Sequence, residues 1–340
     1  MRSHGRPNYQ VELILCCTDP RDRYYDWMHD RESIQSLSFS GHESFPLRFA
    51  WLTKAVREVE KDPSIFSSDD AIVRLGVGKN MVRSIRHWAN RVGVIEIDGN
   101  KRGGRYRVTK IGSTIFGPQG LDPYLEDPAT VWYVHWRLCS SPETSPTTWY
   151  WVFNQLRRNT FEQAEIIQEL LRLAEGYPGK VPSDSTLYRD LACFVRTYIP
   201  AEPDRKISRE ETYDSPLTEL RLLRKEPESS KFVLERSSRH GLTASFFSFA
   251  LCEFWQAVSP RADTISFEQV TYQPGSPGQV FRITENFCVQ MLESLHEVTS
   301  GAVSFDSTAG IRQVIRHKKL PKPEDLLFQH YEEAYCASNL

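Results

Sequence analysis

Hydrophobic and polar positions follow their clearest pattern between residues 67 and 117. Two serines and two aspartates precede a short apolar run there, which predicts a helix that the sequence Gly76-Val77-Gly78 ends. Apolar side chains then recur every three or four residues from Lys79 to about Val92, which predicts a second, longer helix. The order of helix, tight turn and helix indicates a helix-turn-helix.

Two strands are predicted directly after this second helix. Residues 94–97 and 105–109 have the β-branched or alternating composition of strands, and the polar loop between them contains three glycines and two basic residues. Strands joined by a basic loop behind a helix-turn-helix are typical of a winged helix. Its first helix is expected from Pro46 to about Glu60. The sequence therefore predicts a winged-helix domain over residues 37–118.

Helical spacing of apolar residues continues through residues 129–340, which we expect to form a mostly helical domain. An acidic, turn-rich linker over residues 119–128 separates the two domains, and residues 1–36 lack a stable periodicity and are expected to be a flexible appendage. The predicted fold class is mainly α with a small β wing. In the second domain, helices are predicted at 129–138, 149–156, 185–198, 216–223, 242–258, 285–298 and 308–317, another from a capping box at Thr160–Gln163 to Gly176, and strands at 232–234 and 278–284.

The charge is unevenly distributed along the chain. Forty-two basic residues stand against forty-four acidic ones, so the formal net charge is −2. Residues 67–118 nevertheless contain ten basic side chains and only four acidic ones. A compact basic block in an otherwise acidic protein predicts a local surface that binds a polyanion.

The basic block points to DNA, because its charges fall on one face of the second helix and in the wing. We expect that helix to enter the major groove and the wing to lie near phosphates. A solvated helix face and a protein-binding winged helix are the alternatives. Three of the polar residues, Asn80, His87 and Asn90, are in a position to read base edges. The predicted DNA-binding residues are Lys79, Asn80, Arg83, Arg86, His87, Asn90, Lys101, Arg102, Arg105 and Arg107.

Cysteine usage and hydropathy narrow the cellular setting. The seven cysteines include no Cys-x-x-Cys pair, which argues against a zinc ribbon or a redox motif and favours a reducing cytoplasm. No run of 18 apolar residues is present, so we expect no membrane span. The apolar stretch from Val11 to Cys17 is too short and too polar for a convincing signal peptide.

Two groups of polar residues are candidates for chemistry. His42 is a candidate general base, its neighbour Glu43 a further catalytic group, and Arg48 a phosphate ligand. Judged by the residues alone, a purely structural hairpin is the favoured interpretation: Glu43 would cap a helix or form a salt bridge, and His42 would bond to a backbone carbonyl. The carboxylates Asp122, Glu126 and Asp127 could bind Mg²⁺ or Mn²⁺ together with Glu43, although a plain acidic linker is favoured.

Several motifs, taken in order, resemble one family. This ordered set resembles the SspB-type proteins of bacterial single-stranded DNA phosphorothioation systems, over about residues 38–317. The resemblance implies a role in DNA modification and anti-phage defence, in which DNA is nicked or engaged so that sulfur replaces a non-bridging phosphate oxygen. It also implies a cysteine desulfurase and an ATP-using sulfurtransferase as partners, and it strengthens the case for His42 and Glu43. The motifs are residues 39–52, 75–82 with 85–88, 122–127, 132–136, 149–154 and 216–220.

Two functions follow from these observations. One is a Mg²⁺-dependent DNA nickase, in which the metal would stabilise the attacking and leaving oxygens. The other is a non-catalytic DNA-binding specificity subunit that docks sulfur-transfer proteins. A DNA-bound regulator of transcription is less favoured, because so much of the chain follows the DNA module.

Overall fold

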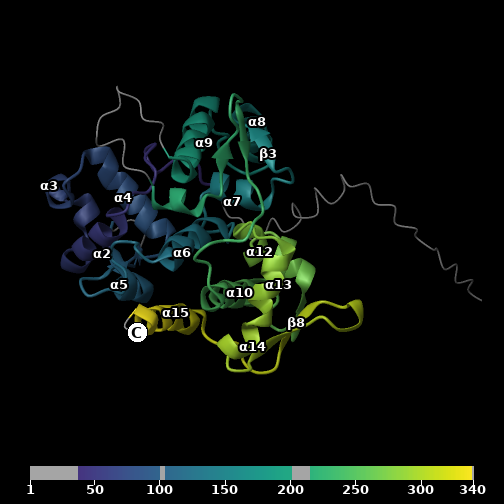
Figure 1. Ribbon diagram of the computed structural model, residues 1–340. Helices are drawn as coiled ribbons and strands as arrows, with labels where there is room; N and C mark the ends of the chain where they lie inside the picture. Colours follow the sequence, from purple (N-terminus) through teal and green to yellow (C-terminus); the bar gives the residue numbers. More distant parts are fainter. Residues whose placement is uncertain (1–36, 100–103, 201–214, 339–340) are drawn as a thin grey trace, which may run out of the picture. The chain divides into compact units, whose positions relative to one another are not determined.

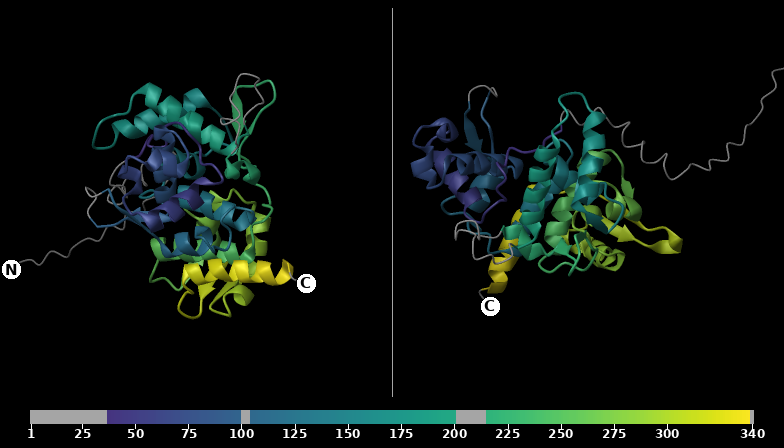
Figure 2. Two further views of the ribbon diagram at one scale, coloured as in Figure 1. Left: turned by 90° about the vertical axis from the view of Figure 1, so that its left-hand side faces the viewer. Right: turned by 90° about the horizontal axis from the view of Figure 1, so that it is seen from above.

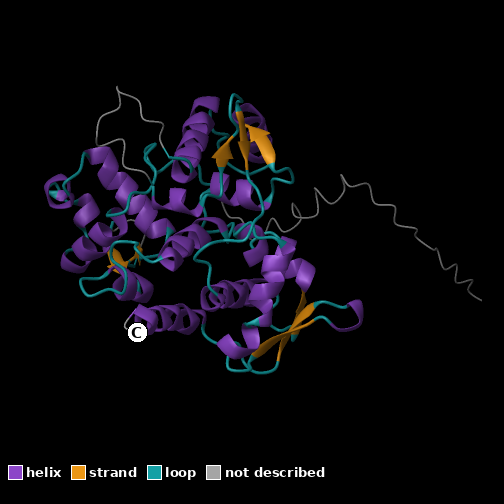
Figure 3. Cartoon of the chain, viewed as in Figure 1, coloured by secondary structure: helices purple, strands orange, loops and turns teal. Residues whose placement is uncertain are grey.

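The computed structural model describes residues 37–99, 104–200 and 215–338, all within one compact unit that spans Ser36–Leu340 (Figure 1). Helices dominate it, and the strands form small antiparallel sheets (Figure 3). The predicted fold class, mainly α with a little β structure, is thereby confirmed. The predicted appendage of residues 1–36 lies outside the described residues, and the division of the remainder into two domains stays a prediction.

The elements expected for residues 71–109 are present. Gly76 ends α3 in the left-handed conformation, at φ 64°, which glycine adopts without a steric penalty. The strands β1 and β2 pair antiparallel, with Ile95 opposite Val108 and Ile97 opposite Tyr106. The elements of this part are α2 (Trp51–Lys61), η2 (Ile65–Ser67), α3 (Ala71–Leu75), α4 (Lys79–Arg91), β1 (Ile95–Ile97), β2 (Tyr106–Val108) and α5 (Lys110–Phe116).

The first helix begins later than predicted, at Trp51 rather than at Pro46. Immediately before Pro46 the backbone is left-handed at Glu43 and Ser44, with φ 48° and 66°. L-residues rarely adopt this conformation, and a right-handed helix cannot pass through it. Residues 37–46, here called the strap, therefore form an irregular segment.

The rest of the chain is mostly helical, as predicted. Its core contains the indoles of Trp132, Trp136 and Trp149, each at most 1 % exposed. Buried rings cannot stack on bases, so the core interpretation of these aromatic helices is correct. The helices are α6 (Pro128–Cys139), α7 (Thr147–Asn154), α8 (Gln163–Glu175), α9 (Asp184–Tyr198), η4 (Pro216–Leu220), α10 (Ala244–Val258), α11 (Phe267–Tyr272), α12 (Pro277–Val280), α13 (Glu285–Glu293), α14 (Leu295–Val298), η5 (Thr308–Gly310) and α15 (Pro323–Ser338).

Two three-stranded antiparallel sheets flank these helices, in the orders β3-β5-β4 and β6-β8-β7. The C-terminal helix α15 packs along α10 (Figure 2). Among the described residues, no helix is both long and apolar enough to cross a membrane. The strands are β3 (Thr160–Glu162), β4 (Arg224–Lys225), β5 (Lys231–Val233), β6 (Thr264–Ser266), β7 (Val303–Asp306) and β8 (Gln313–Arg316).

Three local predictions for this part are wrong. The segment expected to be one helix at 308–317 contains the short helix η5 and then strand β8, which pairs with both β6 and β7. The strand expected at 278–284 begins as helix α12, since Ser276 caps its first turn and proline occupies its first position. The capping box of α8 starts at Glu162 rather than at Thr160, which belongs to strand β3.

Candidate functional site

The polar face of α4 is exposed over the first half of the helix. Lys79, Asn80, Arg83 and Arg86 point to solvent, while the opposite face buries residues such as Trp88 in the core. No side chain caps the N-terminus of α4, and the space around its N-cap, Gly78, is open. Such an open helix start is favourable for a phosphate group, because its N–H groups and the helix dipole both attract negative charge.

The β1–β2 hairpin follows α4 and contributes further exposed cations. Arg105 and Arg107 point to solvent. Arg107 forms an ion pair with Glu96 on the neighbouring strand, at 3.0 Å between Nε and Oε1. The predicted wing residues Lys101 and Arg102 lie outside the described residues.

The other two predicted base-reading residues of α4 face the protein. The Asn90 amide donates to the carbonyl of Ile95 at 3.4 Å and so connects α4 to β1. The His87 ring packs edge-on against Trp88, with 5.0 Å between ring centroids, and lies under Gly41 of the strap. Burial, together with the nearby His42, Arg91 and Arg86, holds the pKa of His87 well below its usual value. Neither side chain is presented to a base edge.

The side chain of His42, in the strap, is buried, and both of its ring nitrogens are engaged. Its Nε2 lies 2.8 Å from Oδ1 of Asp190, and each side chain is 1 % exposed. The backbone N–H of Ser44 donates to Nδ1 at 3.1 Å. Because Nδ1 accepts, Nε2 carries the proton and donates to the carboxylate. In this arrangement the imidazole has no free lone pair with which to act as a base.

Asp190, on α9, binds the strap through Oδ1 and α7 through Oδ2. Besides His42, it accepts from the N–H of Ser40 at 2.6 Å and from the hydroxyl of Thr148 at 2.5 Å. The carbonyl of His42 in turn accepts from Ser84 of α4 at 2.7 Å. The strap therefore joins α4 to α7 and α9. The structural hairpin interpretation predicts a backbone carbonyl as the partner of His42; the observed partner is the Asp190 carboxylate.

Glu43 lies near the exposed face of α4, and Arg48 lies just before the start of α2. Glu43 is partly exposed and faces Arg83, at 3.5 Å between Oε1 and Nη1. The guanidinium of Arg48 lies over the rings of Phe45 and Trp51, 5.9 and 5.4 Å from their centroids. The structure thus brings Glu43 to the predicted DNA surface.

Arg196 is a surface cation that the sequence patterns did not single out. It projects from α9 and donates to the carbonyl of Ser44 at 2.6 Å. A second exposed arginine, Arg189, precedes it by two helical turns. This seven-residue spacing was a readable signal on a predicted helix, but nothing in the sequence places α9 beside the strap.

Two of the carboxylates predicted to bind a metal, Asp122 and Asp127, make hydrogen bonds within the protein. Asp122 is buried and accepts from the N–H groups of Glu126 and Asp127 at 2.8 and 3.0 Å, and from Thr130 at 2.5 Å. These bonds shape the turn that leads into α6. Each oxygen of Asp122 accepts at least one of these bonds.

Asp127 caps α6 and contacts α15. Its carboxylate accepts from the N–H of Ala129 at 2.8 Å and lies 3.0 Å from Nε2 of His330. Burial opposes ionisation, but these two hydrogen bonds outweigh it and lower the pKa of Asp127. Over the described ranges, no three His, Cys, Asp or Glu side chains are grouped so that they could hold a metal ion.

Comparison with known proteins identifies the family. Residues 39–331 match the family described as "Protein of unknown function (DUF4007)", and the chain belongs to this family. No curated protein matches.

Two solved structures show the same fold. They are described as "Magnesium ion-bound SspB crystal structure" and "SspB crystal structure", each with 29% sequence identity and a TM-score of 0.79. Each comparison covers 88% of this chain and 89% of the other. The resemblance to SspB-type proteins is thereby confirmed.

Proposed function

We propose that this protein is a DNA-binding component of a bacterial DNA phosphorothioation system that acts in anti-phage defence. α2, α3, α4 and the β1–β2 hairpin would act as a winged helix over residues 37–118. The exposed face of α4 carries the proposal. The similarity of the whole chain to SspB supports the assignment to a phosphorothioation system, because the resemblance of the sequence implies such a system.

Several observations support DNA as the ligand of this face. Lys79, Arg83 and Arg86 follow one side of a helix whose N-terminus is open, and the cations of the hairpin lie next along the chain. Phosphate contacts of this kind provide affinity and register but no sequence choice. Of the three residues predicted to read bases, only Asn80 is exposed, so we assign sequence-independent contacts to most of the surface.

The test is DNA binding by the double variant Arg83→Glu/Arg86→Glu, measured by fluorescence anisotropy over a range of salt concentrations. Two lost phosphate contacts should reduce the slope of log affinity against log salt by about 1.8, and the affinity at low salt should fall at least tenfold. Lys318→Glu/Lys319→Glu is the matched control, because it makes the same charge change at exposed positions after β8. Unchanged affinity in the α4 variant would contradict the proposal.

The helical residues 129–340 would dock the sulfur-transfer proteins, a cysteine desulfurase and an ATP-using sulfurtransferase, in the cytoplasm. This assignment follows the resemblance. Sedimentation of the purified proteins together, with and without DNA, tests it. Failure of both partners to associate under either condition would overturn it.

Nicking of DNA is a second candidate function. It is favoured by the SspB structure that is described as magnesium-bound. Glu43 is the catalytic candidate that reaches the DNA surface, whereas the geometry of His42 supports a positioning role. The wild-type protein should convert supercoiled plasmid to open circles in the presence of Mg²⁺ or Mn²⁺, and a chelator should prevent this conversion. Glu43→Gln should abolish nicking and retain binding, while an adaptor would open no plasmid under any of these conditions.

A further inference from the structure

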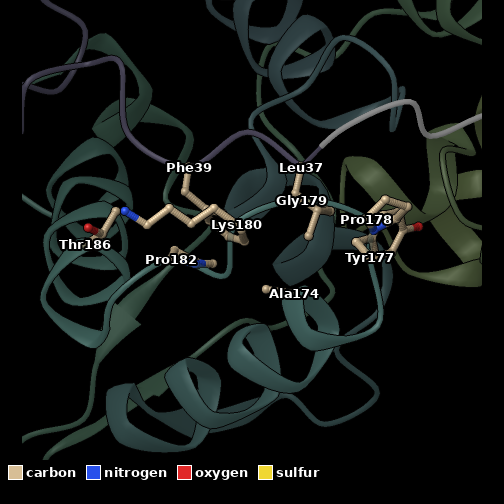
Figure 4. A pocket seen from close by; sticks show the side chains of 9 residues that line it. All are labelled: Leu37, Phe39, Ala174, Tyr177, Pro178, Gly179, Lys180, Pro182 and Thr186. Atoms are coloured by element: carbon tan, nitrogen blue, oxygen red, sulfur yellow. The ribbon is translucent and has the colours of Figure 1, made fainter.

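A pocket of about 310 Å³ lies where the strap crosses the connection between α8 and α9 (Figure 4). The strap contributes Phe39, the connection contributes Tyr177, Pro178 and Lys180, and α9 contributes Thr186. The volume is at the small end of ligand pockets, which span about 300–1,000 Å³. It therefore suits one small, partly flat group better than a folded partner.

The lining combines ring surfaces with one cation. Phe39 and Tyr177 are only partly buried, in contrast to the indoles of the core. The side chain of Lys180 runs across the pocket, and its amine end lies toward Thr186 (Figure 4). Aromatic faces stack on nucleobases of any sequence, and a lysine ammonium binds phosphate as a point charge. The chemistry of the lining is that of a nucleotide site.

The pocket is connected to the DNA surface by the strap. Phe39 lines the pocket, and four residues later Glu43 faces Arg83 of α4. In parallel, α9 runs from Thr186 in the pocket to Arg196 at the carbonyl of Ser44. Ten residues of helix span about 15 Å, so α9 bridges the distance from the pocket to the strap at Ser44.

The charges along α9 suit a DNA strand on this route. Arg189 and Arg196 are both exposed on α9, which runs from Thr186 in the pocket to the strap at Ser44. Asp184 is the only acidic side chain exposed on this helix, because Asp190 is buried under the strap. A single strand that left the α4 surface would therefore meet cations along its way to the pocket.

We propose that this pocket takes one unpaired base of a DNA strand that leaves the duplex at α4 and follows α9. Phe39 and Tyr177 provide the stacking surface, and Lys180 binds the phosphate next to the base. The inference rests on the DNA-binding function proposed above and deepens it: the preferred substrate is a junction of duplex and single strand rather than duplex alone.

The experiment compares wild type on an intact duplex and on the same duplex with a three-nucleotide gap in one strand. Stacking of one base should tighten binding to the gapped duplex about tenfold, equivalent to about 1.4 kcal/mol. Abasic nucleotides opposite the gap should remove the gain. Lys180→Glu/Tyr177→Ala should also remove it while leaving affinity for the intact duplex within twofold. Lys319→Glu is the charge control and should retain the gain.

Two further measurements distinguish a loss of base binding in the pocket from a folding defect in the variants. Lys180→Arg keeps the charge and should keep the preference for the gap. A 2-aminopurine base opposite the gap should lose fluorescence when wild type binds, through stacking, and should keep it with Tyr177→Ala.

The outcomes distinguish the two proposals. Equal affinity of wild type for gapped and intact duplex, or a gain that survives in Lys180→Glu/Tyr177→Ala, would overturn the pocket assignment. If Arg83→Glu/Arg86→Glu still weakens duplex binding in that case, the proposed function stands. Failure of wild type to bind either DNA would overturn both.

Discussion

His42 and Asp190 form a buried acid–imidazole pair whose hydrogen bonds come from several segments of the chain. The carboxylate receives Ser40 of the strap and Thr148 of α7 as well as the imidazole. A charge placed out of water is tolerated only when such partners surround it. The pair therefore has a structural role: it fixes the strap to α7 and α9 and is not a reactive group.

Replacing His42 by alanine should destabilise the protein. The change leaves the Asp190 carboxylate buried without its imidazole partner, and breaking a buried pair in this way costs about 3 kcal/mol. Urea unfolding followed by circular dichroism measures the loss. His296→Ala, at an exposed position, should change the free energy of unfolding by less than about 0.5 kcal/mol. Equal stability of the two variants would contradict this structural role of the His42–Asp190 pair.

Glu43→Gln should strengthen binding to intact duplex. The wild-type carboxylate faces Arg83 with both side chains partly exposed, so the pair is worth well under about 1 kcal/mol. Removal of the negative charge should raise affinity at low salt about twofold to threefold, an effect that fades as salt increases. Weaker binding by this variant in the anisotropy assay would show that Glu43 supports the DNA surface in another way.

The elements of the molecule differ in how far local sequence determines them. α4 and the hairpin were predictable, because the hydrophobic period of the helix and the turn residues on either side of it agree with one another. β8 was not, because its conformation depends on pairing with β6 and β7, which lie elsewhere in the sequence. The strap was not either, since its left-handed Glu43 and Ser44 are held by distant partners. Asp190 and Arg196 were not predicted as site residues for the same reason: their contacts with the strap join segments that lie far apart in the sequence.

The contact between α6 and α15 should respond to pH. Asp127 has a lowered pKa in the folded protein, so its ionised form adds stability that is present above the ordinary value of 3.8 and is lost as pH falls through the folded value. Asparagine caps a helix as well as aspartate does. Asp127→Asn should therefore lose only the charged bond to His330, about 1 kcal/mol at pH 7 after solvent screening.

Urea unfolding of both proteins at pH 7 and pH 3 measures this. The two should differ at pH 7, and the difference should be smaller at pH 3, because the ionised wild-type carboxylate loses its contribution as the pH falls below 3.8 and through its lowered pKa. A difference that is the same at both pH values would assign the effect to packing instead of ionisation.

Across the molecule, the part that carries α4 and the helical part share one continuous set of contacts. The rings of Trp88 and Trp149 pack at 5.4 Å between centroids. The hydroxyl of Tyr133 donates to the carbonyl of Val92 at 3.2 Å, and Arg91 donates to the carbonyl of Thr144 at 2.7 Å. Separation of the two parts would expose apolar rings and leave buried polar groups without partners.

The chain should therefore unfold in one cooperative transition. A fragment of residues 37–118 should melt at a temperature at least about 10 °C lower than the full chain, or without cooperativity, because it lacks Asp190 and Trp149. Scanning calorimetry of both proteins checks this. A fragment as stable as the full chain would show that the winged-helix part is energetically independent.

The packing of Trp88 against Trp149 also gives the contact between α4 and α7 a spectroscopic signal. Two indoles held at a fixed angle of 66° couple their strong far-ultraviolet transitions, and such coupling gives a characteristic couplet in the far-ultraviolet circular dichroism spectrum. Because one ring belongs to α4 and the other to α7, the couplet depends on their relative orientation. DNA that shifts α4 would change it in the unlabelled protein, so the native chain contains its own optical reporter of movement at the DNA surface.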